Sequence, residues 1–273
     1  LCLALRMSGP ALGCDPVSIQ SMNPASVEHR EALVTCLARP EPELRDQFAY
    51  TRLSELLRDL RPATEQLEFL AAQLDRLLQQ PDPVGVAHPF AILVLAEIAR
   101  TDRIEAWMSP GQRQNLVDKA VLYLENVSDY RGFDPQVGWR HGVAHGADLA
   151  MQLTRNPELS SAQQLQLLRA IARQVAPAHA YRCGVPARLA RPVLFIAGRN
   201  ELEQEDWEAW FEALTDPAPL SSWNAAWQDA DGLARRHNLR AFALEIYLNA
   251  TLSEQPGIQA LEPHAVAVLQ ALR

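Results

Sequence analysis

The chain has 273 residues, of which 48% are hydrophobic and 21% are charged, a composition typical of a globular protein with a sizeable core. Its net charge of −8 argues against a broad nucleic-acid-binding surface, because phosphate binding depends on clustered cations. The sequence lacks the Gly-x-x-x-x-Gly-Lys loop of nucleotide-binding proteins and the Gly-x-Ser-x-Gly elbow of serine hydrolases, so neither function is indicated by its common motif. No apolar run reaches the ~18–20 residues that cross a bilayer, so we expect no transmembrane segment.

The N-terminal 13 residues differ from the rest of the chain. Residues 1–5 are similar to the end of a signal-peptide apolar region, and Ala11-Leu12-Gly13 has the small-x-small form of a cleavage site. We therefore interpret residues 1–13 as the remnant of a signal peptide and residues 14–273 as a single all-α domain. An internal arginine and a proline weigh against a signal peptide. The sequence is therefore compatible with export, for example to the periplasm, and with a cytoplasmic location.

The cysteines leave the compartment open. Cleavage after Gly13 would leave Cys14, Cys36 and Cys183. This set allows one disulfide in an oxidising compartment, but its pairing cannot be read from the sequence. Cys183 beside His179 is interpreted as a partly buried structural thiol rather than as a nucleophile.

Apolar residues recur at steps of about three to five in residues 44–57, 67–78 and 165–175, as expected for amphipathic helices. Ser160 is placed to cap one helix. No sustained period-two pattern with hairpin turns is present. We expect about eleven helices of mostly ~12–18 residues joined by short loops. The predicted fold is all-α, an α/α superhelix or HEAT-like stack of antiparallel helical hairpins, with a compact irregular helical domain as the alternative.

The longest predicted non-helical stretch, residues 128–137, lies directly before the most chemically rich segment. Loops that are held by a rigid scaffold often carry function. Gly132 is expected to adopt a positive φ in a tight turn. Arg131 is expected to pair with Asp129 as a structural clasp, or else to bind a carboxylate of a substrate.

The segment from Trp139 to Leu153 is predicted to form a helix. On a helix of 3.6 residues per turn, His141, His145 and Asp148 lie on one face. Two glycines within this predicted helix, at ~1 kcal/mol each relative to alanine, indicate that a neighbouring helix or a ligand approaches the backbone closely.

One interpretation of this face is a metal site. His141 and His145 would bind a divalent ion such as zinc, with Asp148 as a third ligand or as a partner that orients His145. Asp129 or Asp134 would complete the coordination. A glycine stands where the zincin motif has its glutamate base, which argues against zincin-type proteolysis.

A buried polar network is the interpretation of this face that the sequence favours over a metal site. His145 would then donate to Asp148 or to a backbone carbonyl, since buried polar groups need partners whether or not they are active. The third interpretation is a pocket for a small molecule or peptide. Its predicted residues are Asp129, Arg131, Trp139, His141, His145 and Asp148.

Three pieces of this region resemble the signature of a bacterial family of unknown function, the domain of unknown function 2785 family. They are Asp129-x-Arg131-Gly132-Phe133, Gly138-Trp139-x-His141 and Ala144-His145-Gly146-Ala147-Asp148. Weaker similarity extends from about residue 30 to about residue 250. The resemblance implies a helical protein with no established activity. Residues 183–189, Cys-Gly-Val-Pro-Ala-Arg-Leu, depart from the family pattern, which tends to place acids before the Arg-Leu pair.

These observations favour a helical scaffold that binds a peptide, a protein or a small molecule, with the His/Asp face lining its pocket. The alternative is a metal-dependent or histidine-based hydrolase or lyase that uses His141, His145 and Asp148, with His145 as general base. The scaffold is preferred because no nucleophile or complete acid–base pair is evident. An enzyme would require the candidate residues to converge on an open cavity.

Overall fold

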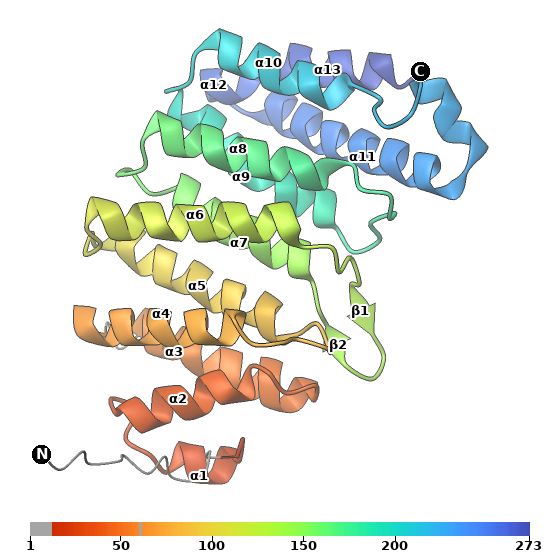
Figure 1. Ribbon diagram of the computed structural model, residues 1–273. Coiled ribbons are helices and arrows are strands. Elements are labelled where there is room, and N and C mark those ends of the chain that lie inside the picture. The colour runs from red at the N-terminus through yellow and green to blue at the C-terminus, as the bar shows by residue number, and fades with distance from the viewer. Residues whose placement is uncertain (1–12, 60–61) are drawn as a thin grey trace, which may run out of the picture.

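The computed structural model describes residues 13–59 and 62–273 (Figure 1). Within these residues there are thirteen α-helices, a π-helical segment (η1), a 3₁₀ segment (η2) and two short strands. In chain order they are α1 (Pro16–Gln20), α2 (Val27–Cys36), η1 (Glu43–Tyr50), α3 (Thr51–Asp59), α4 (Thr64–Leu78), α5 (Ala87–Ile104), α6 (Pro110–Asn126), β1 (Phe133–Asp134), β2 (Gly138–Trp139), α7 (Gly142–Thr154), α8 (Ser161–Val175), α9 (Val185–Arg199), α10 (Gln204–Thr215), η2 (Trp223–Gln228), α11 (Ala230–Leu252), α12 (Pro256–Gln259) and α13 (Glu262–Ala271). The predicted all-α class is confirmed.

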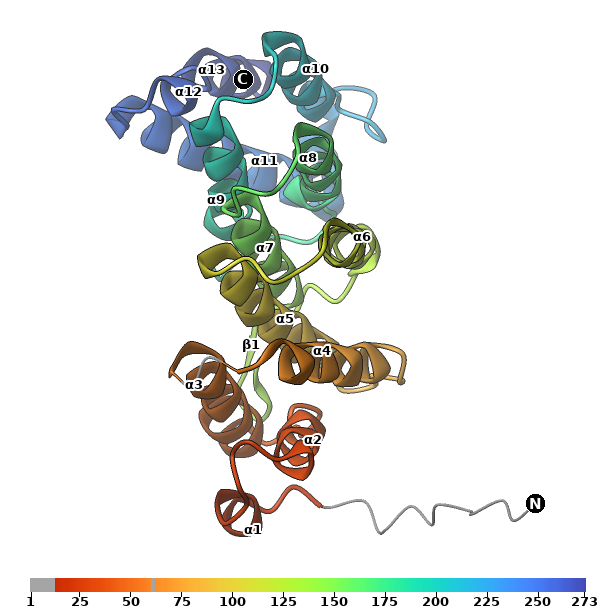
Figure 2. The ribbon, with the colours of Figure 1, turned by 90° about the vertical axis from the view of Figure 1, so that its left-hand side faces the viewer.

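The helices form two layers of stacked hairpins. Helices α3, α5, α7, α9 and α11 pack in succession, and α4, α6 and α8 pack across them against α5, α7 and α9. The turned view shows α4, α6 and α8 on one side of the stack and α5, α7 and α9 on the other (Figure 2). Helix α5 is buried around most of its circumference, as expected for a helix that is apolar on nearly every side.

Local signals explain several helix boundaries. The Ser160 hydroxyl accepts from the Gln163 backbone N–H and caps α8, as predicted from the sequence. The predicted helix over residues 44–57 has a different form at its start, since residues 43–50 are π-helical and only α3 is regular. π-Helical segments are rare in proteins and occur often at functional sites.

Every second connection lies at the same end of the stack, on the right of Figure 1. These connections are residues 79–86, 127–141 and 176–184. The longest of them, residues 127–141, contains a small antiparallel ladder in which Phe133 pairs with Trp139 and Asp134 with Gly138. Two residues per strand are too few to produce a period-two pattern, so the sequence shows no sign of this hairpin.

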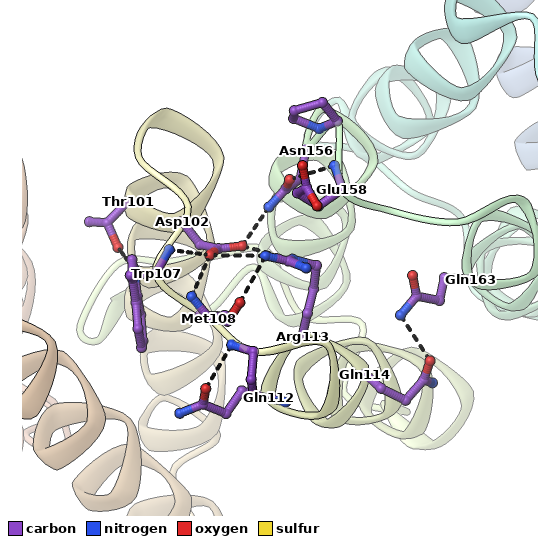
Figure 3. Close-up of polar contacts among 12 residues, drawn as sticks. Thr101, Asp102, Trp107, Met108, Gln112, Arg113, Gln114, Asn156, Glu158 and Gln163 are labelled. Atoms are coloured by element: carbon purple, nitrogen blue, oxygen red, sulfur yellow. Dashed lines mark hydrogen bonds and ion pairs between the residues drawn. The ribbon is translucent and has the colours of Figure 1, made fainter.

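At the opposite end, Asp102 joins three segments (Figure 3). Its carboxylate accepts from the backbone N–H groups of Trp107 and Met108 at 3.0 and 2.8 Å, and from Asn156 at 2.6 Å. Arg113 donates to both carboxylate oxygens, at 2.9 and 3.2 Å. Burial opposes the charge, but Arg113 and the backbone donors lower the pKa of Asp102 below its ordinary value. The cluster ties the ends of α5 and α6 to the α7–α8 connection.

The N-terminal region carries a disulfide between Cys14 and Cys36, with Cα atoms 5.1 Å apart, which ties the segment before α1 to α2. Cys183 is the free cysteine among the described residues. Residues 1–12, which hold most of the predicted signal-peptide remnant, lie outside the described residues. No helix of the described chain is long and apolar enough to span a membrane. Export stays a prediction.

We predict that Asp102→Asn lowers the free energy of unfolding by about 3–5 kcal/mol, because it leaves the buried Arg113 guanidinium without its counter-charge. Urea denaturation at pH 7 measures this change. The matched control is Asp118→Asn, at an exposed carboxylate on α6, which should change stability by less than about 0.5 kcal/mol. Equal changes in the free energy of unfolding in the two variants would show that the Asp102 cluster does not stabilise the fold.

Candidate functional site

A buried arginine anchors the β1–β2 hairpin. The Arg45 side chain, in η1, is fully buried and donates to the backbone carbonyls of Val137 at 2.8 Å and Trp139 at 3.4 Å. It also donates to the carboxylate of its neighbour Asp46 at 2.6 Å. The contacts of Arg45 with the hairpin were not predictable from the sequence, because these partners are 92 and 94 residues away along the chain.

The hairpin approaches η1 closely at a glycine. Gly138 has a φ of +74°, and a Cβ atom there would lie 3.0 Å from a side-chain carbon of Pro42. The prediction that Gly132 adopts a positive φ is wrong, since Gly138 takes that conformation instead. Gly132 is needed for another reason: a Cβ at this position would lie 2.7 Å from Cys183 Sγ.

His141 does not belong to the helix that follows it. Helix α7 begins at Gly142, and His141 precedes it with a left-handed φ of +53°, a conformation that costs an L-residue ~1–2 kcal/mol. Its ring stacks on Trp139, with centroids 4.2 Å apart and planes at 7°. The predicted start of the helix at Trp139 is therefore wrong by three residues. The rings of His141 and His145 are still neighbours, with centroids 5.9 Å apart.

His145 is buried against α5. Its Nδ1 lies 3.1 Å from the carbonyl oxygen of Pro89, which makes the protonated Nδ1 the donor of a hydrogen bond. The Phe90 ring lies in a T-shaped arrangement with the His145 ring, with centroids 5.2 Å apart. Burial, reinforced by the nearby His141, lowers the pKa of His145 to about 3. Of the two partners predicted for His145 in a buried network, the structure contains the backbone carbonyl.

Asp148 pairs with an arginine and not with a histidine. Arg188 Nη1, from α9, donates to the two Asp148 carboxylate oxygens at 2.7 and 2.6 Å. Burial raises the pKa of Asp148, and Arg188 opposes this shift. Arg188 thus supplies, from a helix 40 residues further along the chain, the partner of a residue in the sequence motif.

A second acid–arginine pair joins Arg58 of α3 to Glu97 of α5, with Tyr50 of η1 close to it. Arg58 binds the buried carboxylate of Glu97 through Nε at 2.8 Å and through a second contact from Nη2. Burial and the negative charge of Glu97 raise the pKa of Tyr50 to about 12. These three residues were not predicted. Their only signal in the sequence is a glutamate inside the otherwise apolar run of α5.

The predicted Asp129–Arg131 clasp is present. Arg131 Nε donates to both Asp129 carboxylate oxygens at 2.8 and 3.1 Å, and its Nη2 reaches the carbonyl oxygen of Val84 at 3.3 Å. Burial opposes the charge on Asp129, but Arg131 holds the pKa of this carboxyl below its usual value. Arg140 adds a parallel tie, with Nη1 3.2 Å from Asp134 and Nε 3.0 Å from the Val84 carbonyl oxygen.

A cavity of about 330 Å³ lies between the 127–141 and 176–184 connections, and we name it the loop cavity. Its lining includes Asp129, Arg131 and His141 from the predicted set, but not Trp139, His145 or Asp148. The structure therefore divides the predicted pocket residues into three that line the cavity, Trp139 stacked beside it, and two that lie buried with other partners. The loop cavity is also lined by Tyr130, Gly132, Phe133, Asp134, Arg140, Gly142, Val143, His179, Ala180, Tyr181, Arg182, Cys183 and Val185.

The predicted metal ligands are not assembled as a three-residue set. Within residues 13–59 and 62–273, no group of three or more His, Cys, Asp or Glu side chains is placed to hold a metal ion. Nδ1 of His145 faces a carbonyl oxygen and Asp148 is held by Arg188, which accounts for this. Binding of zinc by His141, His145 and Asp148 stays a prediction, which elemental analysis of the purified protein tests.

The glycines of α7 are explained by a neighbouring helix. A Cβ at Gly146 would lie 2.8 Å from Leu124 Cδ2, and one at Gly142 would lie 3.2 Å from the Tyr123 hydroxyl. Both contacts come from α6. Of the two predicted causes of these glycines, close helix packing is the one that the structure shows.

A family model described as protein of unknown function (DUF2785) matches residues 75–248. The chain belongs to this family. The match confirms the resemblance inferred from the motifs and runs from the end of α4 into α11. A search of curated proteins and a search of solved structures each found no match. Arg45, Tyr50 and Arg58 of this DUF2785 protein lie outside the matched segment.

We predict that His145 makes the native state of this DUF2785 protein sensitive to acid. Its pKa falls from 6.5 to about 3 on folding, so below pH 6.5 the unfolded chain binds a proton that the native state does not. Stability is lost as the pH falls, by up to ~1.4 kcal/mol per unit from this residue between pH 6.5 and about 3. Urea denaturation at pH 7, 6 and 5 should show a shallower slope in His145→Asn. His237→Asn, at an exposed histidine, should keep the wild-type slope, and an unchanged slope in His145→Asn would contradict the prediction.

We predict that Arg45→Met loosens the hairpin, because the carbonyl groups of Val137 and Trp139 lose their donor. Amide hydrogen exchange followed by mass spectrometry should become at least ~10-fold faster in residues 133–141 and stay unchanged in α8. Arg52→Met, at an exposed arginine of α3, is the matched control. Wild-type exchange in residues 133–141 of Arg45→Met would show that the hairpin is held by other contacts.

Proposed function

We propose that this DUF2785 protein binds a small anionic molecule, one with a carboxylate or phosphate group, in the loop cavity. The observation that carries the proposal is the charge of the lining. Arg131, Arg140 and Arg182 line the cavity together with Asp129 and Asp134, in a chain whose net charge is −8. Each aspartate is paired with one of the first two arginines. Within the described residues Arg182 has no ion pair, so its guanidinium is free for a ligand.

Two helix N-termini add positive potential to the loop cavity. Gly142 and Val185, the first residues of α7 and α9, both line the cavity. Neither helix has an acidic residue in its first turn, and neither N-cap residue supplies a side-chain hydrogen bond. The unsatisfied backbone N–H groups and the positive end of the helix dipole favour an anion at such a position.

The backbone at the cavity wall supports a ligand site as well. His141 lines the cavity in a left-handed conformation that is unfavourable for residues other than glycine. Strain of this kind persists only where the surrounding structure enforces it, and it concentrates at ligand sites. Here the stacked Trp139 ring and the anchored hairpin supply that enforcement.

A hydrolase or lyase that uses His145 as its base has less support. His145 does not line the loop cavity. With a pKa lowered to about 3, it is a weak base at neutral pH. Asp148 pairs with Arg188 and so does not orient the His145 ring.

The proposal is tested by measuring the melting temperature of the purified protein with inorganic phosphate, citrate and acetate, at constant ionic strength set with chloride. A ligand present at 100 times its Kd stabilises the native state by ~2.7 kcal/mol, which should raise the melting temperature by several degrees. We expect a shift in melting temperature with at least one of the three anions. We expect Arg182→Ala to lower the apparent affinity for that anion at least ~10-fold.

Arg169→Ala is the matched control, because Arg169 is an exposed arginine on α8 outside the cavity lining. This variant should respond to the anion as the wild type does. The absence of a shift with all three anions overturns the proposal. An equal loss of response in both variants also overturns it, because the effect would then reflect general surface charge.

A further inference from the structure

A second cavity, of about 700 Å³, lies on the other side of the 127–141 connection. It is bounded by the end of α4, the start of α5 and the second half of α6, and we name it the α4–α6 cleft. Asp129, Arg140 and Gly142 line both this cleft and the loop cavity. Its volume is within the range of sites that hold small organic molecules.

The walls of the α4–α6 cleft are mainly apolar. Leu78, Ile92, Leu122, Tyr123 and Val127 line it. Leu122 is 64% exposed although it lies in a cavity wall. An apolar ligand that covers such a solvent-accessible apolar wall lowers the free energy of the complex, because apolar surface is removed from water.

Two buried polar atoms belong to residues of the cleft lining. The Tyr123 hydroxyl and Asp75 Oδ1 have no hydrogen-bond partner among the residues that the structure describes. A buried polar group without a partner is unfavourable, and a ligand that supplies the missing hydrogen bond relieves this penalty. The other carboxylate oxygen of Asp75 accepts from Lys119 at 2.7 Å. Asp75 is therefore already balanced in charge and can accept one more hydrogen bond.

The other acids of the lining are occupied. Asp82 accepts from the backbone N–H groups of Gly85, Val86 and His88 at 2.9, 3.1 and 2.9 Å, and Asp129 is held by an arginine. A second cation in the cleft would find no acid without a partner, whereas a neutral donor would meet Asp75 Oδ1 and the Tyr123 hydroxyl. Among the buried polar atoms of the lining, the ones left without a partner in the described chain are therefore one carboxylate oxygen and one hydroxyl, beside an apolar wall.

We propose that the α4–α6 cleft binds an uncharged, mostly apolar molecule that carries a hydroxyl or amide N–H group. The apolar part covers Leu122 and Ile92, and the hydroxyl or amide group donates to Asp75 Oδ1 and accepts from the Tyr123 hydroxyl. This site is separate from the anion site proposed above and does not depend on it.

The test is a fluorescence titration of the intact protein with 2-naphthol, which is neutral at pH 7, and with 2-naphthoate, an anion of similar shape. We expect 2-naphthol to bind with a Kd below about 100 μM and 2-naphthoate to bind at least ~10-fold more weakly. Tyr123→Phe keeps the ring and removes the unpartnered hydroxyl. It should weaken 2-naphthol binding about 3- to 10-fold and leave the melting temperature unchanged or higher.

Leu122→Arg should weaken 2-naphthol binding at least ~10-fold, because it places a charge in the apolar wall. Leu248→Arg, at a residue of α11 that is 54% exposed, is the matched control and should bind as the wild type does. Both positions are on the surface, so both variants should keep the wild-type circular dichroism spectrum. A wild-type Kd above 1 mM, equal binding of the two naphthalenes, or equal affinity of the two arginine variants overturns the proposal.

Discussion

The guanidinium of Arg45 is fully buried, and its hydrogen bonds to the carbonyls of Val137 and Trp139 determine where the hairpin lies. Taking this charge out of water is costly unless every donor finds an acceptor. The guanidinium also lies 4.7 Å from the centre of the Phe90 ring, which is in T-shaped contact with the His145 ring. One side chain thus connects the N-terminal helices to the hairpin and to the helix that carries the family motif.

The helical class was predictable from the sequence, because a helix that buries one face has apolar residues at steps of three to four. The Asp129–Arg131 clasp was also predictable, since its two members are two residues apart. The partners of His145 and Asp148 were not, because Pro89 and Arg188 are 56 and 40 residues away and nothing local marks them.

The exact start of α7 was also beyond sequence reasoning. A helical pattern continues through Trp139 and His141, and only the anchored hairpin forces His141 into a left-handed conformation. Gly138 also has a positive φ, and the hairpin approaches Pro42 closely at this residue. At His141 tertiary contacts override a local preference, as is expected at functional or strained positions.

The path of the 127–141 connection also bears on how the molecule unfolds. In a stack where each hairpin touches only its neighbours, the two ends can melt independently of each other. Here a segment between α6 and α7 reaches back past the α4–α5 hairpin to η1 (Figure 1). The N-terminal helices and η1 therefore cannot detach from the stack until the hydrogen bonds of Arg45 to the hairpin are broken. A linear array that would otherwise fray from its first hairpin is thereby joined into a larger cooperative unit.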